Sequence, residues 1–130
     1  MLEHASVIGF VPVSDMAAAE DFYAGKLGLT VVDRDSPYAL VLSSNGTMVR
    51  CALTPNVTPQ PFTILGWQVQ DIHASVKDLI AAGIEPIRYT WFDQDADGVW
   101  TAPGGAGFVV WFHDPDRNVL SLSQHTKAAQ

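Results

Sequence analysis

The residues with the clearest capacity for chemistry are three aspartates at every second position, Asp93, Asp95 and Asp97. This spacing matches the opening half of the EF-hand calcium loop, in which oxygen ligands recur along the chain. The complete loop requires a bidentate glutamate at its twelfth position, which is Gly104 here. Because that glutamate is absent and the flanks are typical of strand and loop, the pattern predicts an acidic, solvated loop instead of a calcium site.

The remaining reactive side chains do not form a catalytic pattern. The single cysteine, Cys51, has no adjacent base to activate it and is expected as a small core residue. No histidine has a histidine or glutamate partner at a spacing typical of metal ligands, so each is expected at the surface. The histidines are His4, His73, His113 and His125. The chain also lacks a P-loop and a dinucleotide-binding fingerprint.

Composition narrows the class of protein. The chain has 130 residues, of which 48% are apolar and 16% charged, as expected for one folded domain. A formal charge of −7 disfavours nucleic acid and anionic membrane as partners. No apolar run approaches the ~20 residues of a membrane span, and the first residues lack the basic region of a signal peptide. With one cysteine no internal disulfide can form, so a cytoplasmic location is expected.

Two segments, residues 7–32 and 63–87, follow the same pattern. Each begins with an apolar strand that ends in Val-x-Asp, and each aspartate, Asp15 or Asp71, is a typical helix N-cap. Apolar residues then recur at helical spacing. The chain is therefore predicted to contain an internal repeat, although a chance succession of helix and strands is the alternative.

The later parts of the two segments also correspond. Gly28 and Gly83 stand where a helix C-terminus favours a left-handed residue, and each is followed by a β-prone run. A hairpin is predicted about residues 44–46 and a second about residues 114–118. The sequence therefore predicts an α+β fold with the order βαβββ repeated.

A proline-rich stretch separates the repeats. It reads TPNVTPQPF, and such a sequence favours an extended connector over a further helix or strand. Residues 1–130 are accordingly expected to form a single domain. Its parts are module one at about 5–54, a linker at 55–62 and module two at about 63–125.

The repeat, with DFYAGKLGL at residues 21–29 and WFHDPDRN at residues 111–118, resembles the vicinal oxygen chelate superfamily. This superfamily includes glyoxalase I, extradiol dioxygenases, fosfomycin-modifying enzymes and bleomycin resistance proteins, and the resemblance covers residues 5–124. It implies that each module forms a curled mixed sheet with helices on the outer face and a cleft on the other. Two modules pair to complete a cleft, often across a homodimer.

Most catalytic members of this superfamily hold a divalent metal with His and Glu side chains. On the first strands the resemblance places these ligands at Ile8 and Ile64, seven residues before each capping aspartate. Ser121 stands where the family pattern DPDGN-x-x-E has its glutamate, and Arg50 takes the matching position in module one. Isoleucine has no lone pair to donate, arginine stays protonated, and a lone hydroxyl binds a divalent ion weakly. The resemblance therefore implies a chain without a metal or another cofactor.

Alternation along the strands predicts which side chains line the cleft. The set is mostly apolar and aromatic with a few polar groups, as in small-molecule pockets. Gly66 is expected to leave room for a flat ring on the cleft floor. Trp91 and Trp100 are expected either to form a lid or to pack on their own module. The predicted ligand-binding residues are Phe10, Pro12, Met48, Arg50, Gln68, Trp91, Trp100, Trp111 and Ser121.

These observations favour a metal-free binding protein of the bleomycin-resistance type over an enzyme. The expected ligand is a hydrophobic, aromatic compound such as an antibiotic, and Arg50 is expected either to anchor an anionic or carbonyl group or to form a salt bridge. The expected assembly is a cytoplasmic homodimer. Two alternatives stay open: a metal-dependent lyase, isomerase or dioxygenase of the glyoxalase type, and a metal-free enzyme that uses the same cleft.

Overall fold

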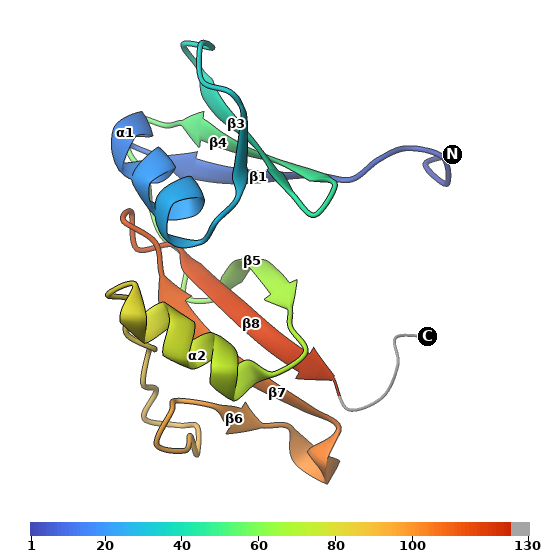
Figure 1. The fold of residues 1–130 in the computed structure, drawn as a ribbon, viewed down its shortest axis with the longest axis vertical. Helices are drawn as coiled ribbons and strands as arrows, with labels where there is room; N and C mark the ends of the chain where they lie inside the picture. The colour runs from blue at the N-terminus through green and yellow to red at the C-terminus, as the bar shows by residue number, and fades with distance from the viewer. Residues whose placement is uncertain (126–130) are drawn as a thin grey trace. The chain divides into compact units, whose positions relative to one another are not determined.

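The computed structural model describes residues 1–125, and the chain divides into two compact units, Met1–Thr58 and Pro59–Gln130. Each unit follows the order β-α-β-β-β that the sequence predicts (Figure 1). The first unit contains β1 (Ile8–Val13), α1 (Met16–Ala19), the π-helical continuation η1 (Glu20–Lys26), β2 (Thr30–Asp33), β3 (Ala39–Ser44) and β4 (Thr47–Leu53). The second unit contains β5 (Thr63–Gln68), α2 (Ile72–Ala81), β6 (Trp100–Thr101), the 3₁₀ turn η2 (Pro103–Gly105), β7 (Gly107–His113) and β8 (Val119–His125).

The two sheets have the same topology. In residues 1–58 the strand order is β1-β4-β3-β2, and in residues 59–125 it is β5-β8-β7-β6. In each sheet the first strand runs parallel to the last, and the other neighbours are antiparallel. The predicted α+β fold of repeated βαβββ modules is therefore confirmed.

Both helices begin as predicted. The Asp15 side chain accepts a hydrogen bond from the Ala18 N–H at 3.1 Å, and the Asp71 side chain accepts one from the Ala74 N–H at 3.2 Å. Each bond satisfies one of the backbone donors that a helix N-terminus leaves without an intrahelical partner. The shared Val-x-Asp pattern therefore fixes the strand-to-helix turn in both units.

The predicted turns also form. Gly28 and Gly83 end the helical segments with φ angles of 84° and 82°, in the left-handed region that favours glycine. The β3–β4 turn has φ angles of 47° at Asn45 and 86° at Gly46. Positive φ at both central residues is characteristic of a type I′ hairpin, which suits the twist of antiparallel strands.

One predicted strand is wrong. The β-prone run after Gly83 does not form a strand, and the second strand of this unit is the two-residue β6, Trp100–Thr101. Pro86 lies in that run, and proline has no N–H to donate to a strand ladder. The chain between α2 and β6 is therefore irregular, and it carries several aromatic rings.

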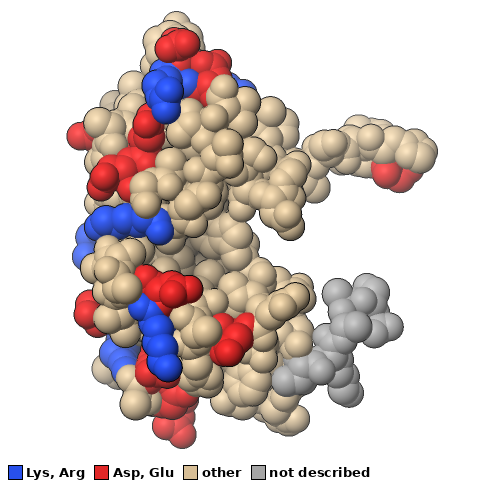
Figure 2. All heavy atoms as spheres, viewed as in Figure 1, with Lys and Arg blue, Asp and Glu red and all other residues tan. Residues whose placement is uncertain are grey.

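Each unit has its core between its sheet and its helix. In the first unit Val11, Cys51 and Tyr23 are fully buried, so the prediction of Cys51 as a core residue is confirmed. In the second unit Trp67 stacks on the buried Phe112 with ring centroids 6.5 Å apart, on the predicted helix side. In the view of Figure 2 basic and acidic side chains lie interspersed, over loops as well as over the helices of the two units.

Within the described residues no helix combines the length and apolar character needed to cross a membrane.

Candidate functional site

The face of the second sheet opposite α2 carries most of the side chains predicted to bind a ligand. Trp111 lies opposite Ser121 in the β7–β8 ladder, and Trp100 lies opposite Val109 in the β6–β7 ladder. Directly paired residues place their side chains on the same face of a sheet. Gln68 occupies this face too, because it is two residues from Gly66, the partner of Ser121. Sequence alternation therefore predicts the composition of this face.

Five rings on this face pack into one aromatic cluster: Tyr89, Trp91, Phe92, Trp100 and Trp111. Phe92 stacks on Trp111 with centroids 5.0 Å apart and planes 4° apart, and Tyr89 meets Trp111 edge-on at 5.4 Å. Trp91 reaches Tyr89 at 4.9 Å yet remains 71% exposed. Of the two expectations for Trp91 and Trp100, the structure thus supports packing on their own unit.

Tyr89 and Phe92 were not predicted from the sequence as part of this site. The sequence feature that could have indicated them is the run Tyr89-Thr90-Trp91-Phe92, which has three aromatic residues in four positions of an irregular segment. Trp111, which alternation does predict, and Trp100, which was expected as a lid or packing residue, lie on strands. Two segments distant from each other in the sequence therefore combine to form the aromatic cluster.

The side chain of Gln94 holds the irregular segment in place. Its oxygen accepts a hydrogen bond from the Tyr89 N–H at 2.8 Å. Its nitrogen donates to the Ile87 carbonyl at 2.9 Å and to the Gly98 carbonyl at 2.8 Å. These bonds replace the strand pairing that the segment lacks, so they position the rings of the aromatic cluster.

The acidic loop is organised around Asp95. One carboxylate oxygen accepts from the N–H groups of Asp97 and Val99, both at 2.9 Å, and the other lies 3.0 Å from His73 Nε2. The Asp95 carboxylate therefore stabilises the turn of the acidic loop and connects this loop to His73 on α2. His73 lies at the surface, as expected, and its contact with Asp95 is one that the sequence did not reveal, because Asp95 lies 22 residues further along the chain.

This pair shifts both ionisation equilibria. The hydrogen bond that the protonated His73 ring donates to Asp95 raises the pKa of His73 against a smaller opposing effect of desolvation. Desolvation raises the pKa of Asp95, but hydrogen bonds from His73 and from the Val99 and Asp97 N–H groups lower it by more. The net effect is a pKa below the ordinary value of an aspartate. His73 therefore holds its proton to a higher pH than a free histidine does.

The positions where the family places metal ligands do not fit a metal in this chain. Ile8 and Arg50 occupy them in the first unit, and Ile64 and Ser121 occupy them in the second. Divalent first-row metals prefer carboxylate, imidazole and thiolate donors, and three of these four side chains offer no lone pair. In residues 1–125 no three His, Cys, Asp or Glu side chains are grouped so that they could hold a metal ion.

The room expected above Gly66 is filled by its neighbour. A Cβ atom at Gly66 would lie 2.9 Å from Ser121 Oγ and 3.2 Å from the Ser121 carbonyl oxygen. The missing side chain therefore accommodates the close approach of β8, not a flat ring. Ser121 keeps its hydroxyl over the glycine, on the face of the aromatic cluster.

The first unit presents a different face. Its open sheet surface carries three exposed apolar side chains, Ile8 at 43%, Phe10 at 62% and Met48 at 37%. Pro12 and Arg50 follow on the same face and are half-buried. No carboxylate of residues 1–58 lies within ion-pair distance of Arg50, so the salt-bridge alternative has no partner within this unit.

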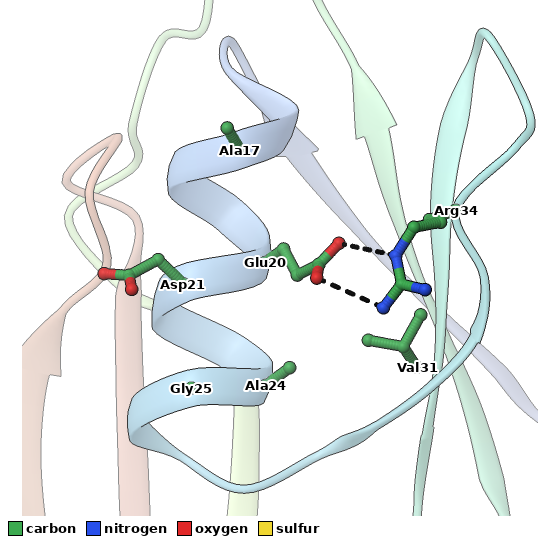
Figure 3. Close-up of a pocket in the computed structure, with 7 residues that line it drawn as sticks. All are labelled: Ala17, Glu20, Asp21, Ala24, Gly25, Val31 and Arg34. Carbon is green, nitrogen blue, oxygen red and sulfur yellow. Dashed lines mark hydrogen bonds and ion pairs between the residues drawn. The ribbon is translucent and has the colours of Figure 1, made fainter.

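A hollow on the helix side of the first unit has its own internal ion pair (Figure 3). Arg34 Nε and Nη2 each lie 3.3 Å from a carboxylate oxygen of Glu20. Asp21 points away from this pair in Figure 3. Both partners are substantially exposed, so the pair contributes little, and its arginine is already neutralised.

Solved structures with the same fold include two antibiotic-related proteins. TnmS3, an antibiotic binding protein from Streptomyces sp. CB03234, is 24% identical with a TM-score of 0.73, and the match covers 97% of this chain and 99% of that one. The fosfomycin resistance protein FosX from Listeria monocytogenes is 15% identical with a TM-score of 0.69, covering 100% and 97%. A superfamily member from Sphaerobacter thermophilus DSM 20745 is 23% identical with a TM-score of 0.73, covering 96% and 100%.

No curated protein matches the chain. At these identities the solved structures establish the fold alone. The family model "Glyoxalase/Bleomycin resistance protein/Dioxygenase superfamily" matches residues 2–122, which is nearly the whole sequence. The chain therefore belongs to the glyoxalase/bleomycin resistance protein/dioxygenase superfamily.

Proposed function

We propose that this protein binds a hydrophobic, aromatic small molecule without a metal, in the manner of the bleomycin resistance branch, and sequesters a compound such as an antibiotic. The observation that carries the proposal is the aromatic cluster on the open face of the second sheet. A metal-free mechanism is supported by the isoleucine, arginine and serine residues at the family's ligand positions.

The aromatic cluster suits a flat, apolar ligand. An aromatic ring that stacks on indole or phenol gains about 0.5–1.5 kcal/mol beyond the burial of its area. Trp91 is 71% exposed, so a ligand that covers it also removes apolar surface from water. Ser121 and Gln68 lie on the same face and supply hydrogen-bonding groups that orient the ligand.

The solved structures support the class of ligand. The description of TnmS3 as antibiotic binding and that of FosX as a fosfomycin resistance protein place small-molecule antibiotics among the compounds that this fold handles. One scaffold hosts many functions, so the argument for this chain rests on its own side chains.

A homodimer and a cytoplasmic location are part of the proposal. Ile8, Phe10 and Met48 form an uncharged, exposed surface that a second copy of the chain would cover. In that dimer Phe10, Pro12, Met48 and Arg50 line a binding cleft together with residues of the partner subunit. Cys51 is the single cysteine and is buried, which suits a reducing compartment.

Calorimetric titration with aromatic antibiotics, beginning with bleomycin, tests this function. Trp111→Ala should weaken binding of any compound that binds the wild-type protein by about tenfold or more, because aromatic anchors dominate such sites. Trp67→Phe is the matched control, since Trp67 stacks on Phe112 on the helix side. Equal affinity of wild type and Trp111→Ala would remove the aromatic cluster from the site.

A further inference from the structure

A hollow in the second unit lies next to the aromatic cluster and shares Tyr89 with it. Its volume is about 330 Å³, within the range typical of small-ligand pockets. Its walls combine apolar and cationic groups. Those that matter are Pro59, Pro61, Arg88, Tyr89, His113 and Arg117.

The two arginines of this hollow, Arg88 and Arg117, form no ion pair with a carboxylate within residues 59–125. The Arg117 guanidinium makes no hydrogen bond or ion pair there, and neither does the His113 ring. Arg88 donates to the carbonyl oxygens of Asp95 and Ala96, both at 2.5 Å, so its bonds are to neutral groups. Within the described part of the chain, two guanidinium groups thus lie at this hollow without a carboxylate bonded to either, although the formal charge of the chain is −7.

The nearest carboxylate is already engaged. One oxygen of Asp114 accepts from the N–H groups of Asp116 and Asn118, both at 2.9 Å. The other accepts from the Asn118 amide, also at 2.9 Å. Asp114 is 5% exposed and serves the β7–β8 turn. Both carboxylate oxygens of Asp114 thus accept hydrogen bonds from groups of the turn itself.

The backbone at Arg117 is strained. Its φ angle is 66°, in the left-handed region where a residue with a Cβ atom costs roughly 1–2 kcal/mol. Glycine would fill this turn position without that cost. An arginine in an unfavourable conformation at the edge of a hollow points to a use for its side chain.

Two titratable side chains of this hollow are partly buried. Burial lowers the pKa of His113, and the charge of Arg117 lowers it further against a smaller effect of Asp114. Burial alone raises the pKa of Tyr89. Both shifts show that the His113 and Tyr89 side chains are partly desolvated, while Arg117 beside them is exposed to solvent.

We propose that this hollow binds the carboxylate of a small aromatic acid. The planar guanidinium of Arg117 matches a carboxylate, His113 offers a ring nitrogen, and Arg88 adds charge. Pro59, Pro61 and Tyr89 give the ring of the ligand apolar walls, which a heavily hydrated inorganic anion would not use. The proposal goes beyond the proposed function, because Arg117 and His113 are not part of the aromatic cluster.

Benzoate is the probe, and NMR of the full chain follows the His113 ring and the Arg117 side-chain N–H. Benzoate should shift both signals to saturation, whereas benzamide, its neutral counterpart, should not. Arg117→Gly should weaken benzoate binding about tenfold or more, because it removes a charged hydrogen-bond donor. This variant suits the positive φ, so it should unfold at the same temperature as wild type or a higher one.

Two control variants locate the site. Arg34→Gln removes an arginine of the first unit and should leave benzoate affinity unchanged. Trp100→Ala removes a ring that contacts Phe92 and Trp111 but not Tyr89, so it should also leave benzoate affinity unchanged. Benzoate binding that depends on Trp100 as strongly as on Arg117 would overturn the location of the site.

Three further results would overturn the proposal. These are the absence of a saturable shift with benzoate, equal affinity of wild type and Arg117→Gly, and inorganic phosphate that binds as tightly as benzoate. None of them bears on the aromatic cluster, whose own test is Trp111→Ala. Failure of the anion site and failure of the proposed function are therefore distinguishable.

Discussion

The two units share their topology, their helix caps and the parallel pairing of first and last strands, but their open sheet faces differ. In the first unit the strands leave Ile8, Phe10 and Met48 exposed. In the second, the irregular segment after α2 lays Tyr89 and Phe92 against the rings on the strands. The comparison shows that the same local sequence patterns produce the same topology in both units, whereas the side chains on the two open sheet faces differ.

The difference arises from one replaced strand. The first unit follows its helix directly with β2, Thr30–Asp33, while the second inserts residues 84–99 before the short β6. Gln94 and Asp95 hold that insertion by hydrogen bonds from their side chains. The proposed binding function thus rests on an irregular segment that connects regular elements of the scaffold.

The largest expected effect is on the two cores. Phe112→Ala in the second unit should lower the free energy of unfolding by about 3–5 kcal/mol, and Leu42→Ala in the first by about 2–5 kcal/mol. Both side chains are fully buried between sheet and helix. Chemical denaturation measures the loss, and Phe112→Leu is the milder control. A loss below about 1 kcal/mol for Phe112→Ala would contradict the core described for the second unit.

The exposed face of the first unit gives the next effect. Phe10→Asp should convert the proposed homodimer to a monomer, because a buried charge without a partner opposes association. Analytical ultracentrifugation measures the mass, and Ile80→Asp on α2, where the side chain is 46% exposed, is the control that should remain dimeric. A wild-type monomer at micromolar concentration, or a dimeric Phe10→Asp variant, would contradict the role of this face.

The two helix caps, Asp15 and Asp71, should contribute equally to the free energy of unfolding. Asp15→Ala and Asp71→Ala should each lower the free energy of unfolding by about 1 kcal/mol, because each removes the acceptor for an N–H of the first turn. The asparagine variants keep an acceptor and should lose only a few tenths. Thermal unfolding measures all four variants. A loss of stability in only one of the two alanine variants would show that the two helix caps are not equivalent.

The smallest effect distinguishes two histidines of the second unit. An NMR titration should give His73 a pKa above its ordinary value, because Asp95 binds its protonated form, and His113 a pKa below it, mainly because of burial. Since the pKa of His73 is raised on folding, its stabilisation is complete below the unfolded pKa and is lost as pH rises through the folded one.

Relative to His73→Gln, the stability of the wild type should therefore decline slightly from pH 6 to pH 8. The lowered pKa of His113 acts in the opposite direction, equally in both proteins, so it cancels in this comparison. The pKa of Asp95 is lowered, so its contribution is present above its unfolded pKa and is lost as pH falls through the folded one. Identical pH profiles for wild type and His73→Gln would remove the link between α2 and the acidic loop.

The sequence predicts what depends on near neighbours. Val-x-Asp, the glycine after each helix and the Asn45-Gly46 turn encode their conformations within a few residues, and all are confirmed. Strand alternation likewise places Trp111 and Ser121 on one face. These features follow from backbone geometry, which holds whatever the rest of the chain does.

The remaining features depend on contacts between distant residues. The strand expected after Gly83 is replaced because the Gln94 side chain satisfies the backbone instead. The His73–Asp95 pair and the close approach of Ser121 to Gly66 join residues 22 and 55 positions apart (95 − 73 and 121 − 66). No local pattern specifies such contacts, so propensity alone could not predict them.

The most direct test of the metal-free account is thermal unfolding of the protein with a bound aromatic antibiotic, measured before and after treatment with EDTA. The account predicts the same increase in unfolding temperature in both conditions, and no stoichiometric first-row metal in the purified protein. An increase that disappears on chelation and returns when Mn²⁺, Fe²⁺, Ni²⁺ or Zn²⁺ is restored would contradict it.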